Sequence, residues 1–273
     1  MSDGAATPGT ARDQLLGSVR TAARALKEFT VADAELGVTD VARRLGITKS
    51  TAHRVLATLA AERLLEQNPV TGRYRPALAL YEIGTTVTEH VDLHQAALPV
   101  LTTLRHRTGD LVHVAVLDGL EVVYVERLES HHMMPIFRRV GHRLPAHSTS
   151  SGKVLLAALP RDELTRRLDG AQLEARTART FVDAGRLLRE LDAVARRGWA
   201  INREESQLGI VSVGAPVRGA DGTVIAAVSV VGALPRMQGT TLNQCAQLVV
   251  EAADVVSARL GHRPGRRPSP RDR

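Results

Sequence analysis

The sequence contains a single cysteine, Cys245, among 273 residues. One thiol cannot build an internal disulfide framework, and it cannot supply a cysteine-rich zinc site. Its neighbours follow an apolar helical pattern, so we expect a buried thiol without chemistry of its own. The adjacent pair His131-His132 does not indicate a metal site, because neighbouring side chains in an extended loop point apart. The sequence therefore predicts no metal and no cofactor.

Long apolar runs are also missing. No stretch approaches the roughly 20 apolar residues that a membrane-spanning helix needs, and the polar N-terminus lacks the apolar core of a signal peptide. These absences predict a soluble, cytoplasmic protein with no membrane partner. Internal repeats are absent as well. A length of 273 residues suits one small domain and one domain of ordinary size.

The net charge of +7 is distributed unevenly along the chain. Residues 1–80 carry a net charge of +3, residues 81–258 carry −1, and residues 259–273 carry +5. A basic first segment beside a nearly neutral larger one is typical of a protein that meets phosphate with its N-terminal part. Residues 262–273 are rich in proline and arginine and predict a disordered basic tail, either solvated or making an extra phosphate contact.

Residues 39–65, TDVARRLGITKSTAHRVLATLAAERLL, predict two short helices joined by a sharp turn. Gly46 lies at the turn, where a residue free to adopt positive φ is favoured. Thr39 and Thr48 are the expected N-caps of the two helices. The second helix has apolar residues at the i, i+3, i+4 and i+7 positions, which are Ala52, Val55, Leu56 and Leu59. This arrangement predicts a helix-turn-helix.

The outward face of the second helix begins with polar and cationic side chains. They are Lys49, Ser50, Thr51, His53 and Arg54. A recognition helix presents its N-terminal residues to base edges in the major groove, so hydrogen-bond donors suit these positions. A helical hairpin with a solvated polar face is the alternative, which Gly46 and the two caps disfavour. We expect these five residues to contact an operator in double-stranded DNA, with Lys49 on phosphate.

The next residues, LLEQNPVTGRYRP, fit two short strands at residues 64–67 and 73–75 with a turn at Thr71-Gly72. Such a hairpin is the wing of a winged helix-turn-helix. Arg73 and Arg75 would then contact the sugar-phosphate backbone, which positions a protein without specifying sequence. An exposed hairpin with two unremarkable arginines is the competing interpretation.

Three further segments flank this unit. Residues 1–14 read as a flexible arm. Residues 18–29 form an amphipathic helix whose inward face would include Val19 and Phe29. Residues 77–90 predict a connecting helix that also makes a dimer contact, and a polar break separates it from another helix that starts near Pro99.

The rest of the chain alternates strands and helices. HVAVLDG and EVVYVERL predict a hairpin turning at Asp118-Gly119, and a second hairpin turns at Asp221-Gly222. WAINRE is a shorter strand after a helix over residues 185–197, and helices are expected near residues 152–168 and 241–260. Strands joined by hairpins and covered by helices predict an α+β fold with a largely antiparallel sheet.

The stretch RLPAHSTSSGKVLLAAL carries the most suggestive chemistry of this larger part. Small and hydroxylic residues run directly into an apolar helix, whose free N–H groups suit a carboxylate, although a tightly packed cap has the same composition. Ser150 and Lys153 also match the S-x-x-K of serine acyl-enzymes, but no S-D-N or K-T-G follows. A serine hydrolase or acyltransferase using this pair, with the helix pair for assembly only, is the alternative function. A sensor that acts on protein partners is a third.

Together these pieces resemble the IclR family of bacterial transcription regulators. The matching segments are SVRTAARALKEF, TDVARRLGITKSTAHRVLATL, NPVTGRYRP, HVAVLDGLEVVYVERLES, RVGHRLPAHSTSSGKVLLA, ARRGWAINREESQLGIVSVGAPVR and DGTVIAAVSVVG. They extend from about residue 18 to residue 232. The resemblance implies an N-terminal winged helix-turn-helix at residues 15–77, a linker helix at 78–92 and an effector-binding domain of GAF-like fold at 93–261. It also implies homodimers that pair into homotetramers.

The resemblance further implies a pocket for a small organic acid in the C-terminal domain. Its lining would comprise Ser150, Ser151, Gly152, Asn202, Ser212 and Ser229. Asn202 stands where the family often has an acidic residue, and Val231 where a hydroxyl can occur. Such a site suits an aromatic or medium-sized carboxylic acid. The function expected is an effector-responsive, sequence-specific DNA-binding regulator that represses transcription and is not an enzyme.

Overall fold

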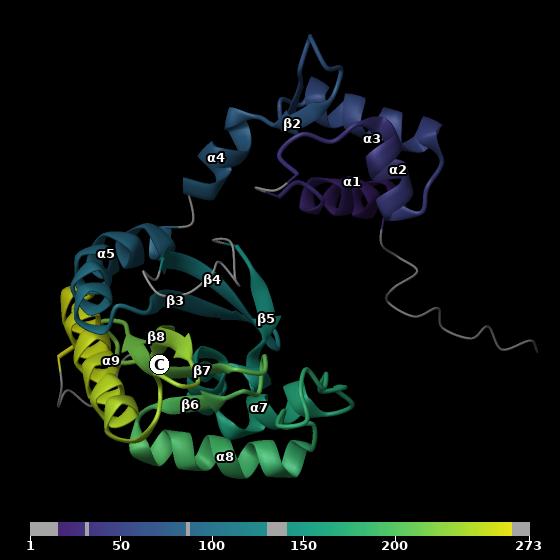
Figure 1. Cartoon of the computed structure of the whole chain (residues 1–273). Coiled ribbons are helices and arrows are strands. Elements are labelled where there is room, and N and C mark those ends of the chain that lie inside the picture. Colours follow the sequence, from purple (N-terminus) through teal and green to yellow (C-terminus); the bar gives the residue numbers. More distant parts are fainter. Residues whose placement is uncertain (1–15, 31–32, 86–87, 130–140, 264–273) are drawn as a thin grey trace, which may run out of the picture. The chain divides into compact units, whose positions relative to one another are not determined.

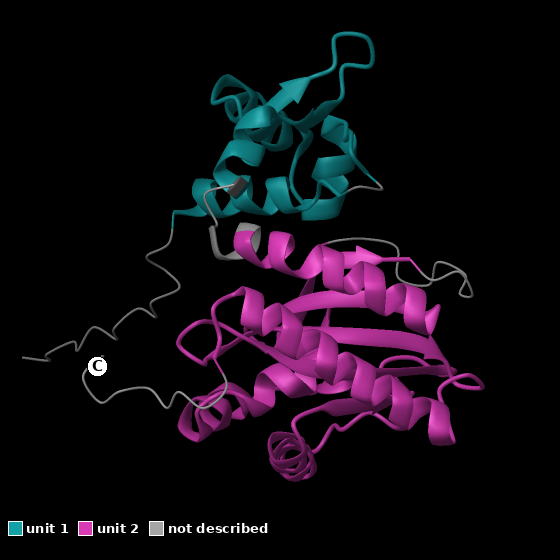
Figure 2. Cartoon of the chain, turned by 90° about the vertical axis from the view of Figure 1, so that its left-hand side faces the viewer, with its two compact units in different colours: residues 1–88 teal, residues 89–273 magenta. Residues whose placement is uncertain are grey.

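The computed structural model describes residues 16–30, 33–85, 88–129 and 141–263. The chain divides into two compact units, residues 1–88 and 89–273, which Figure 2 colours separately. The expected N-terminal arm, most of the basic tail and the pair His131-His132 lie outside the described residues. Among those residues, no helix combines the length and apolar character needed to cross a membrane, and no cluster of side chains is arranged to hold a metal ion.

The first unit contains the predicted helix-turn-helix and its wing. Its elements are α1 (Gly17–Lys27), α2 (Val38–Leu45), α3 (Lys49–Ala61), β1 (Leu65–Gln67), β2 (Tyr74–Pro76) and α4 (Leu78–Thr85) (Figure 1). β1 and β2 pair antiparallel, and Leu36 extends this pairing through two hydrogen bonds with Tyr74. Side chains from α2, α3 and both strands enclose a small apolar core, in which Leu56 and Leu65 are completely buried.

Two of the three local signals in this unit are confirmed. Gly46 adopts a φ of 67° at the turn, and the Thr48 hydroxyl caps α3 by accepting a hydrogen bond from Thr51 N at 3.2 Å. The prediction that Thr39 caps the first helix is wrong, because α2 already begins at Val38. The carboxylate of Asp40 instead reaches back to the N–H of Gly37 at 3.1 Å, as an acidic side chain at the third helical position can do.

The predicted inward face of α1 needs a similar correction. Ala25 is the fully buried residue of this helix, with Leu26 and Phe29 packed beside it, whereas Val19 is exposed. Only the C-terminal half of α1 meets the core of the first unit. Helical periodicity predicts which residues share a face, but it does not say how much of that face is covered.

The second unit is built on one six-stranded antiparallel sheet with the order β5-β4-β3-β8-β7-β6. Its strands are β3 (Leu111–Asp118), β4 (Glu121–Leu128), β5 (Arg143–Pro145), β6 (Ala200–Arg203), β7 (Ile210–Arg218) and β8 (Val224–Ala233). Both predicted hairpins are confirmed. Each turns on a glycine with positive φ, Gly119 at 63° and Gly222 at 87°.

Helices cover both faces of this sheet, which confirms the α+β class (Figure 1). α5 (Thr88–Thr108) and α9 (Gly239–Arg259) enclose one apolar core, which includes Cys245. α6 (Ser150–Ala157), α7 (Arg161–Leu168) and α8 (Ala184–Arg197) enclose a second core on the opposite face. Cys245 is buried, as the sequence predicts, and burial raises the pKa of its thiol to about 12, so the thiol stays protonated at neutral pH.

Pro99 lies inside α5, so the predicted break before it is wrong. A proline in a helix removes the hydrogen bond to the carbonyl four residues earlier, here that of Gln95. Both residues are exposed, so water can bind that carbonyl oxygen. α4 ends at Thr85, and residues 86–87 lie outside the described part of the chain, so the expected helix over residues 77–90 cannot be followed through them.

Candidate DNA-reading helix and effector site

The five predicted DNA-reading residues share the exposed face of the first turns of α3. All five are exposed, whereas Ala52 and Leu56 on the other face are completely buried and fix the orientation of the helix. The Thr48 hydroxyl lies 3.0 Å from Ser50 Oγ and 2.9 Å from Thr51 Oγ1. These contacts link the hydroxyls of Ser50 and Thr51, two of the predicted DNA-reading residues, to the cap of the helix.

The wing arginines flank one hairpin, but both are engaged with carboxylates. Arg73 donates to Asp40 Oδ2 at 2.8 Å and to the backbone oxygen of Glu35 at 3.1 Å. Arg75 pairs with Glu66 at 2.5 Å and approaches Glu35 at 3.8 Å. Each arginine side chain is about half exposed. Contact with phosphate stays a prediction, and it requires these side chains to change partners.

Glu35 is a wing residue that the sequence analysis missed. Its carboxylate accepts hydrogen bonds from Asn68 Nδ2 at 2.9 Å and Thr71 Oγ1 at 3.3 Å, and the bond from Asn68 is the main reason that its pKa is lowered. Asn68 Oδ1 in turn accepts from the N–H groups of Val70 and Thr71. These bonds fix the wing turn against the segment before α2. An isolated acidic residue 33 positions earlier gives no sequence signal of this role.

The predicted effector loop forms the start of α6. Thr149 caps the helix by accepting a hydrogen bond from Gly152 N at 2.9 Å, and Ser150 Oγ lies 2.8 Å from Ser212 Oγ on β7. A Cβ atom on Gly214 would stand 3.0 Å from the backbone of Ser150 and Ser151. The first turn of α6 therefore rests directly on the backbone of β7.

Two rows of side chains cross the sheet on the face that α6 covers. Register pairs define the first row, which is Arg127, His113, Ser229 and Gly214 on β4, β3, β8 and β7. The second row is Leu111, Val231, Ser212 and Asn202 on β3, β8, β7 and β6. Side chains two positions apart on a strand share a face, so Asn202, Ser212 and Ser229 lie on the face that α6 covers. The other three predicted effector residues form the start of α6, so the structure brings all six to this region.

Asn202 lies in the second row, yet its amide already has partners. Its Nδ2 donates to Ser206 Oγ at 2.9 Å, and its Oδ1 accepts from Glu205 N at 2.7 Å. These bonds shape the loop after β6. Contact between the Asn202 amide and a ligand stays a prediction.

His113 in the first row was not singled out from the sequence. It is 2% exposed, and neither ring nitrogen has a hydrogen-bond partner. Burial, with smaller contributions from the charges of Arg127 and His142, lowers its pKa to about 3. Its ring centroid lies 4.4 Å from that of Tyr124. The only sequence signal was a histidine at an inward position of an otherwise apolar strand.

A register shift places Arg127 beside His113. The shift falls between Val114 and Ala115 of β3, so His113 pairs with Arg127 whereas Ala115 pairs with Tyr124. Strict alternation along β4 would put Arg127 on the opposite face from Tyr124, and the bulge puts them on the same face. The Arg127 side chain is 5% exposed and pairs with both carboxylate oxygens of Glu129, at 2.8 and 2.9 Å.

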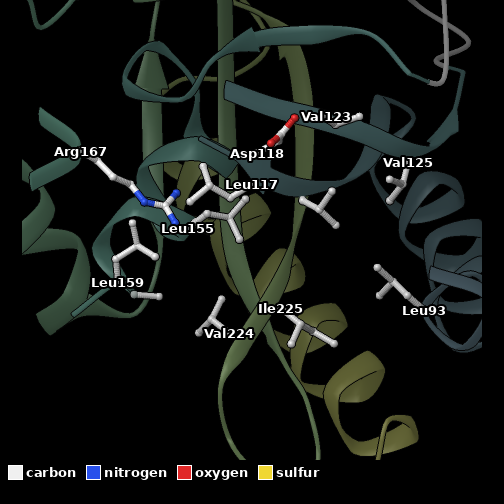
Figure 3. A pocket seen from close by; sticks show the side chains of 12 residues that line it. Leu93, Leu117, Asp118, Val123, Val125, Leu155, Leu159, Arg167, Val224 and Ile225 are labelled. Atoms are coloured by element: carbon white, nitrogen blue, oxygen red, sulfur yellow. The ribbon is translucent and has the colours of Figure 1, made fainter. Parts of the chain in front are cut away.

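A cavity of about 560 Å³ lies elsewhere in the second unit and contains none of the predicted effector residues. The pairing of β3 with β8 ends at Ala115 and Ala227, and the cavity lies beyond this point. Figure 3 shows apolar side chains from several elements facing this space, with the guanidinium of Arg167 at its side. The guanidinium is held by Glu163 and by the backbone oxygen of Gly119.

Comparison with known proteins decides the family. Residues 18–69 match the IclR helix-turn-helix domain, and residues 85–258 match the C-terminal domain of bacterial IclR transcriptional regulators. The chain belongs to the IclR family. The transcriptional regulator XynR of Escherichia coli is 35% identical over 91% of this chain and 98% of its own length. The transcriptional repressor IclR of the same bacterium is 26% identical over 93% of this chain and 94% of its own.

Solved IclR-family structures share the fold as well. The crystal structure of an IclR homolog from Microbacterium hydrocarbonoxydans, complexed with 4-hydroxybenzoate, has a TM-score of 0.78 and 29% identity. The match covers 89% of this chain and 99% of that one. The predicted family resemblance, with its helix-turn-helix and C-terminal effector domain, is therefore confirmed.

The geometry of this IclR-family chain gives no support to the serine-enzyme alternative. A nucleophilic serine needs a base within hydrogen-bonding reach. The Lys153 ammonium instead lies 2.7 Å from Glu205 Oε1 and 3.6 Å from Glu190 Oε1, and the Ser150 hydroxyl bonds to Ser212. Among the hydrogen bonds of the described residues, none joins the serine to the lysine.

Proposed function

We propose that this IclR-family regulator is a sequence-specific repressor, not an enzyme, which releases its operator when its C-terminal unit binds a small organic acid. The observation that carries the proposal is the exposed polar face at the start of α3, held in orientation by the buried Ala52 and Leu56. Because its target is the chromosome, we place the protein in the bacterial cytoplasm.

In this proposal Ser50, Thr51, His53 and Arg54 contact base edges, and Lys49 contacts phosphate. Arg54 has the greatest weight, because a guanidinium can donate two hydrogen bonds to one guanine. Arg73 and Arg75 exchange their carboxylate partners for phosphates when the wing meets the duplex. That exchange is favourable only where the DNA brings phosphates close to the hairpin. It therefore helps to fix the position of the protein along the duplex.

Homodimers would read two half-sites. The first unit exposes large apolar side chains, which supports its self-association. These side chains are Val19 on α1 and Leu78, Tyr81 and Ile83 on α4. Large apolar groups that gather on an exposed helix typically mark a contact with another protein chain. Pairing of two such dimers into a homotetramer belongs to the same proposal.

The acid effector would bind where α6 starts, between Ser150, Ser151 and Gly152 on the helix and Ser212 and Ser229 on the sheet, with Asn202 shaping the nearby loop. Free N–H groups of a helix start favour a carboxylate. A family member solved with 4-hydroxybenzoate supports an acid of this kind. A coupling free energy of about 1–3 kcal/mol between the two sites would change operator affinity about 5–150-fold.

The test compares binding to the DNA upstream of the protein's own gene with binding to a scrambled duplex, at moderate salt. We expect a clear preference for the upstream DNA, its loss in Arg54→Ala, and its retention in Arg189→Ala, which removes an exposed arginine of α8. A wild-type protein without this preference would refute the proposal. Repression is checked with a reporter gene, whose expression should rise when the regulator is deleted.

A further inference from the structure

We propose that His113 binds a hydroxyl group of the effector, so that the effector is a hydroxylated carboxylic acid about one six-membered ring long. The inference rests on the proposed acid site and specifies which acid fits it. The carboxylate would lie at the start of α6, and the hydroxyl would lie two strands away on β3.

His113 and Ser151 carry buried hydrogen-bonding groups without a partner among the described residues. Buried polar groups in folded proteins nearly always have partners. His113 is buried, and both of its ring nitrogens lack a partner within the described structure. The hydroxyl of Ser151, which is also buried, lacks one too. Two unsatisfied buried groups, one on β3 and one in the first turn of α6, are what a site prepared for a polar ligand would show.

The distance from the start of α6 to His113 suits a ligand with one ring. Gly214 lies directly under the start of α6, and His113 lies in the same row two strands further across the sheet. Two strand spacings of about 4.8 Å separate the backbones of β7 and β3 by about 9.6 Å. A ring with a carboxylate at one end and a hydroxyl at the other bridges such a span once each end has its hydrogen bond.

The residues between the two ends suit a ring. Ser229 lies between Gly214, which the helix start covers, and His113, and its small side chain forms a low floor there. Leu111 and Val231, together with Ile210 of β7, form an apolar cluster beside this floor. An unsubstituted ring edge can pack against them.

The chemistry of His113 favours a hydroxyl over a second carboxylate. A neutral imidazole has one donor and one acceptor, and a hydroxyl can satisfy either. A carboxylate offers only acceptors and brings a charge that a buried site must balance. The nearby cation, Arg127, already pairs with both oxygens of Glu129, so within the described part of the chain its charge is balanced without a second carboxylate.

The experiment measures binding of 4-hydroxybenzoate, benzoate and terephthalate to the full-length protein by isothermal titration calorimetry. We expect 4-hydroxybenzoate to bind about fivefold more tightly than benzoate, the ratio that one additional neutral hydrogen bond supplies. His113→Phe keeps a ring beside Tyr124 and should remove this preference while benzoate still binds. His94→Phe, at an exposed histidine of α5, should keep it.

Three results would overturn the inference: equal affinity for benzoate and 4-hydroxybenzoate, tighter binding of terephthalate, or binding of none of the three. If His113→Phe does not fold, His113→Asn replaces it, and partial retention of the preference is then expected because an amide still offers a donor and an acceptor. These outcomes are separate from the promoter test. Preference for the upstream DNA can survive the failure of this inference, and a hydroxyl preference can survive the loss of DNA binding.

Discussion

Lys153 Nζ lies 2.7 Å from Glu205 Oε1 in the second unit, and both side chains are almost completely buried. The pair joins α6 to the loop after β6, and the Phe181 ring covers the ammonium at 5.1 Å. Burial raises the pKa of Glu205 although the charge of Lys153 acts to lower it. If one partner is removed, bulk water cannot solvate the charge that remains, because both side chains are buried.

Removal of one partner should therefore destabilise the protein strongly. We expect Lys153→Met to lower the free energy of unfolding by about 3–5 kcal/mol, because a buried carboxylate loses its cation. Urea unfolding of Lys153→Met, Glu205→Gln and the double variant measures the coupling, which should exceed about 1 kcal/mol. The exposed pair Arg107–Glu251, 3.3 Å apart, is the matched control and should couple by less than about 1 kcal/mol. Equal couplings would contradict this account.

Gly152 should tolerate no side chain. A Cβ atom there would stand 2.2 Å from the backbone oxygen of Ala146, and a backbone atom cannot rotate away. Gly152→Ala should lower the midpoint of thermal unfolding by several degrees, since overpacking typically costs about 1–3 kcal/mol. Gly84→Ala in α4 meets no atom within 4 Å and serves as the control. An unchanged midpoint for Gly152→Ala would show that the start of α6 is more loosely packed than described.

Glu35→Ala separates two effects on DNA binding: the loss of the bonds that fix the wing and the loss of a negative charge. Removing an acidic residue near DNA should by itself tighten binding to any duplex. Because Glu35 also fixes the wing, we expect Glu35→Ala to lower the ratio of specific to non-specific affinity by about fivefold, equivalent to about one hydrogen bond. Glu62→Ala removes the same charge from the exposed end of α3 and should leave the ratio unchanged. Fluorescence anisotropy with both duplexes measures it.

His113 should make the fold sensitive to acid. Its pKa is about 3 in the folded protein, lowered by burial and then by Arg127 and His142, against about 6.5 in an unfolded chain. Between these values the unfolded state binds a proton that the folded state does not, so stability falls as the pH falls. From pH 7.5 to 5.0 this group should remove about 2 kcal/mol. His113→Phe should lose correspondingly less over that interval, measured by urea unfolding at both pH values.

Features set by neighbouring residues were predictable from the sequence. The positive φ of Gly46, the cap of Thr48 and both glycine-centred hairpins depend on a few adjacent residues, and the structure confirms each. The polar face of α3 follows from helical periodicity in the same way. The sequence also located the loop that starts α6 and the two serines and one asparagine on the facing strands, although the family resemblance supplied their grouping.

Features that depend on distant residues were not predictable. Arg73 reads as a free cation, but Asp40, 33 positions earlier, neutralises it. The neighbours of His113 depend on the strand register and on one β-bulge, which no local pattern of β4 reveals. The cap at Thr39 was predicted wrongly because the neighbouring Asp40 accepts the hydrogen bond at the start of α2. The break before Pro99 was predicted wrongly because Pro99 and Gln95 are exposed, so water can bind the carbonyl oxygen that the proline leaves without an N–H.

The contact of α6 with Gly214 has a mechanical consequence. No side chain separates the first turn of the helix from the strand beneath it, so no rotamer change can absorb a displacement there. A displacement of β7 is therefore transmitted directly to the start of α6, and the hydrogen bonds along the helix carry it towards Ala157 at the opposite end.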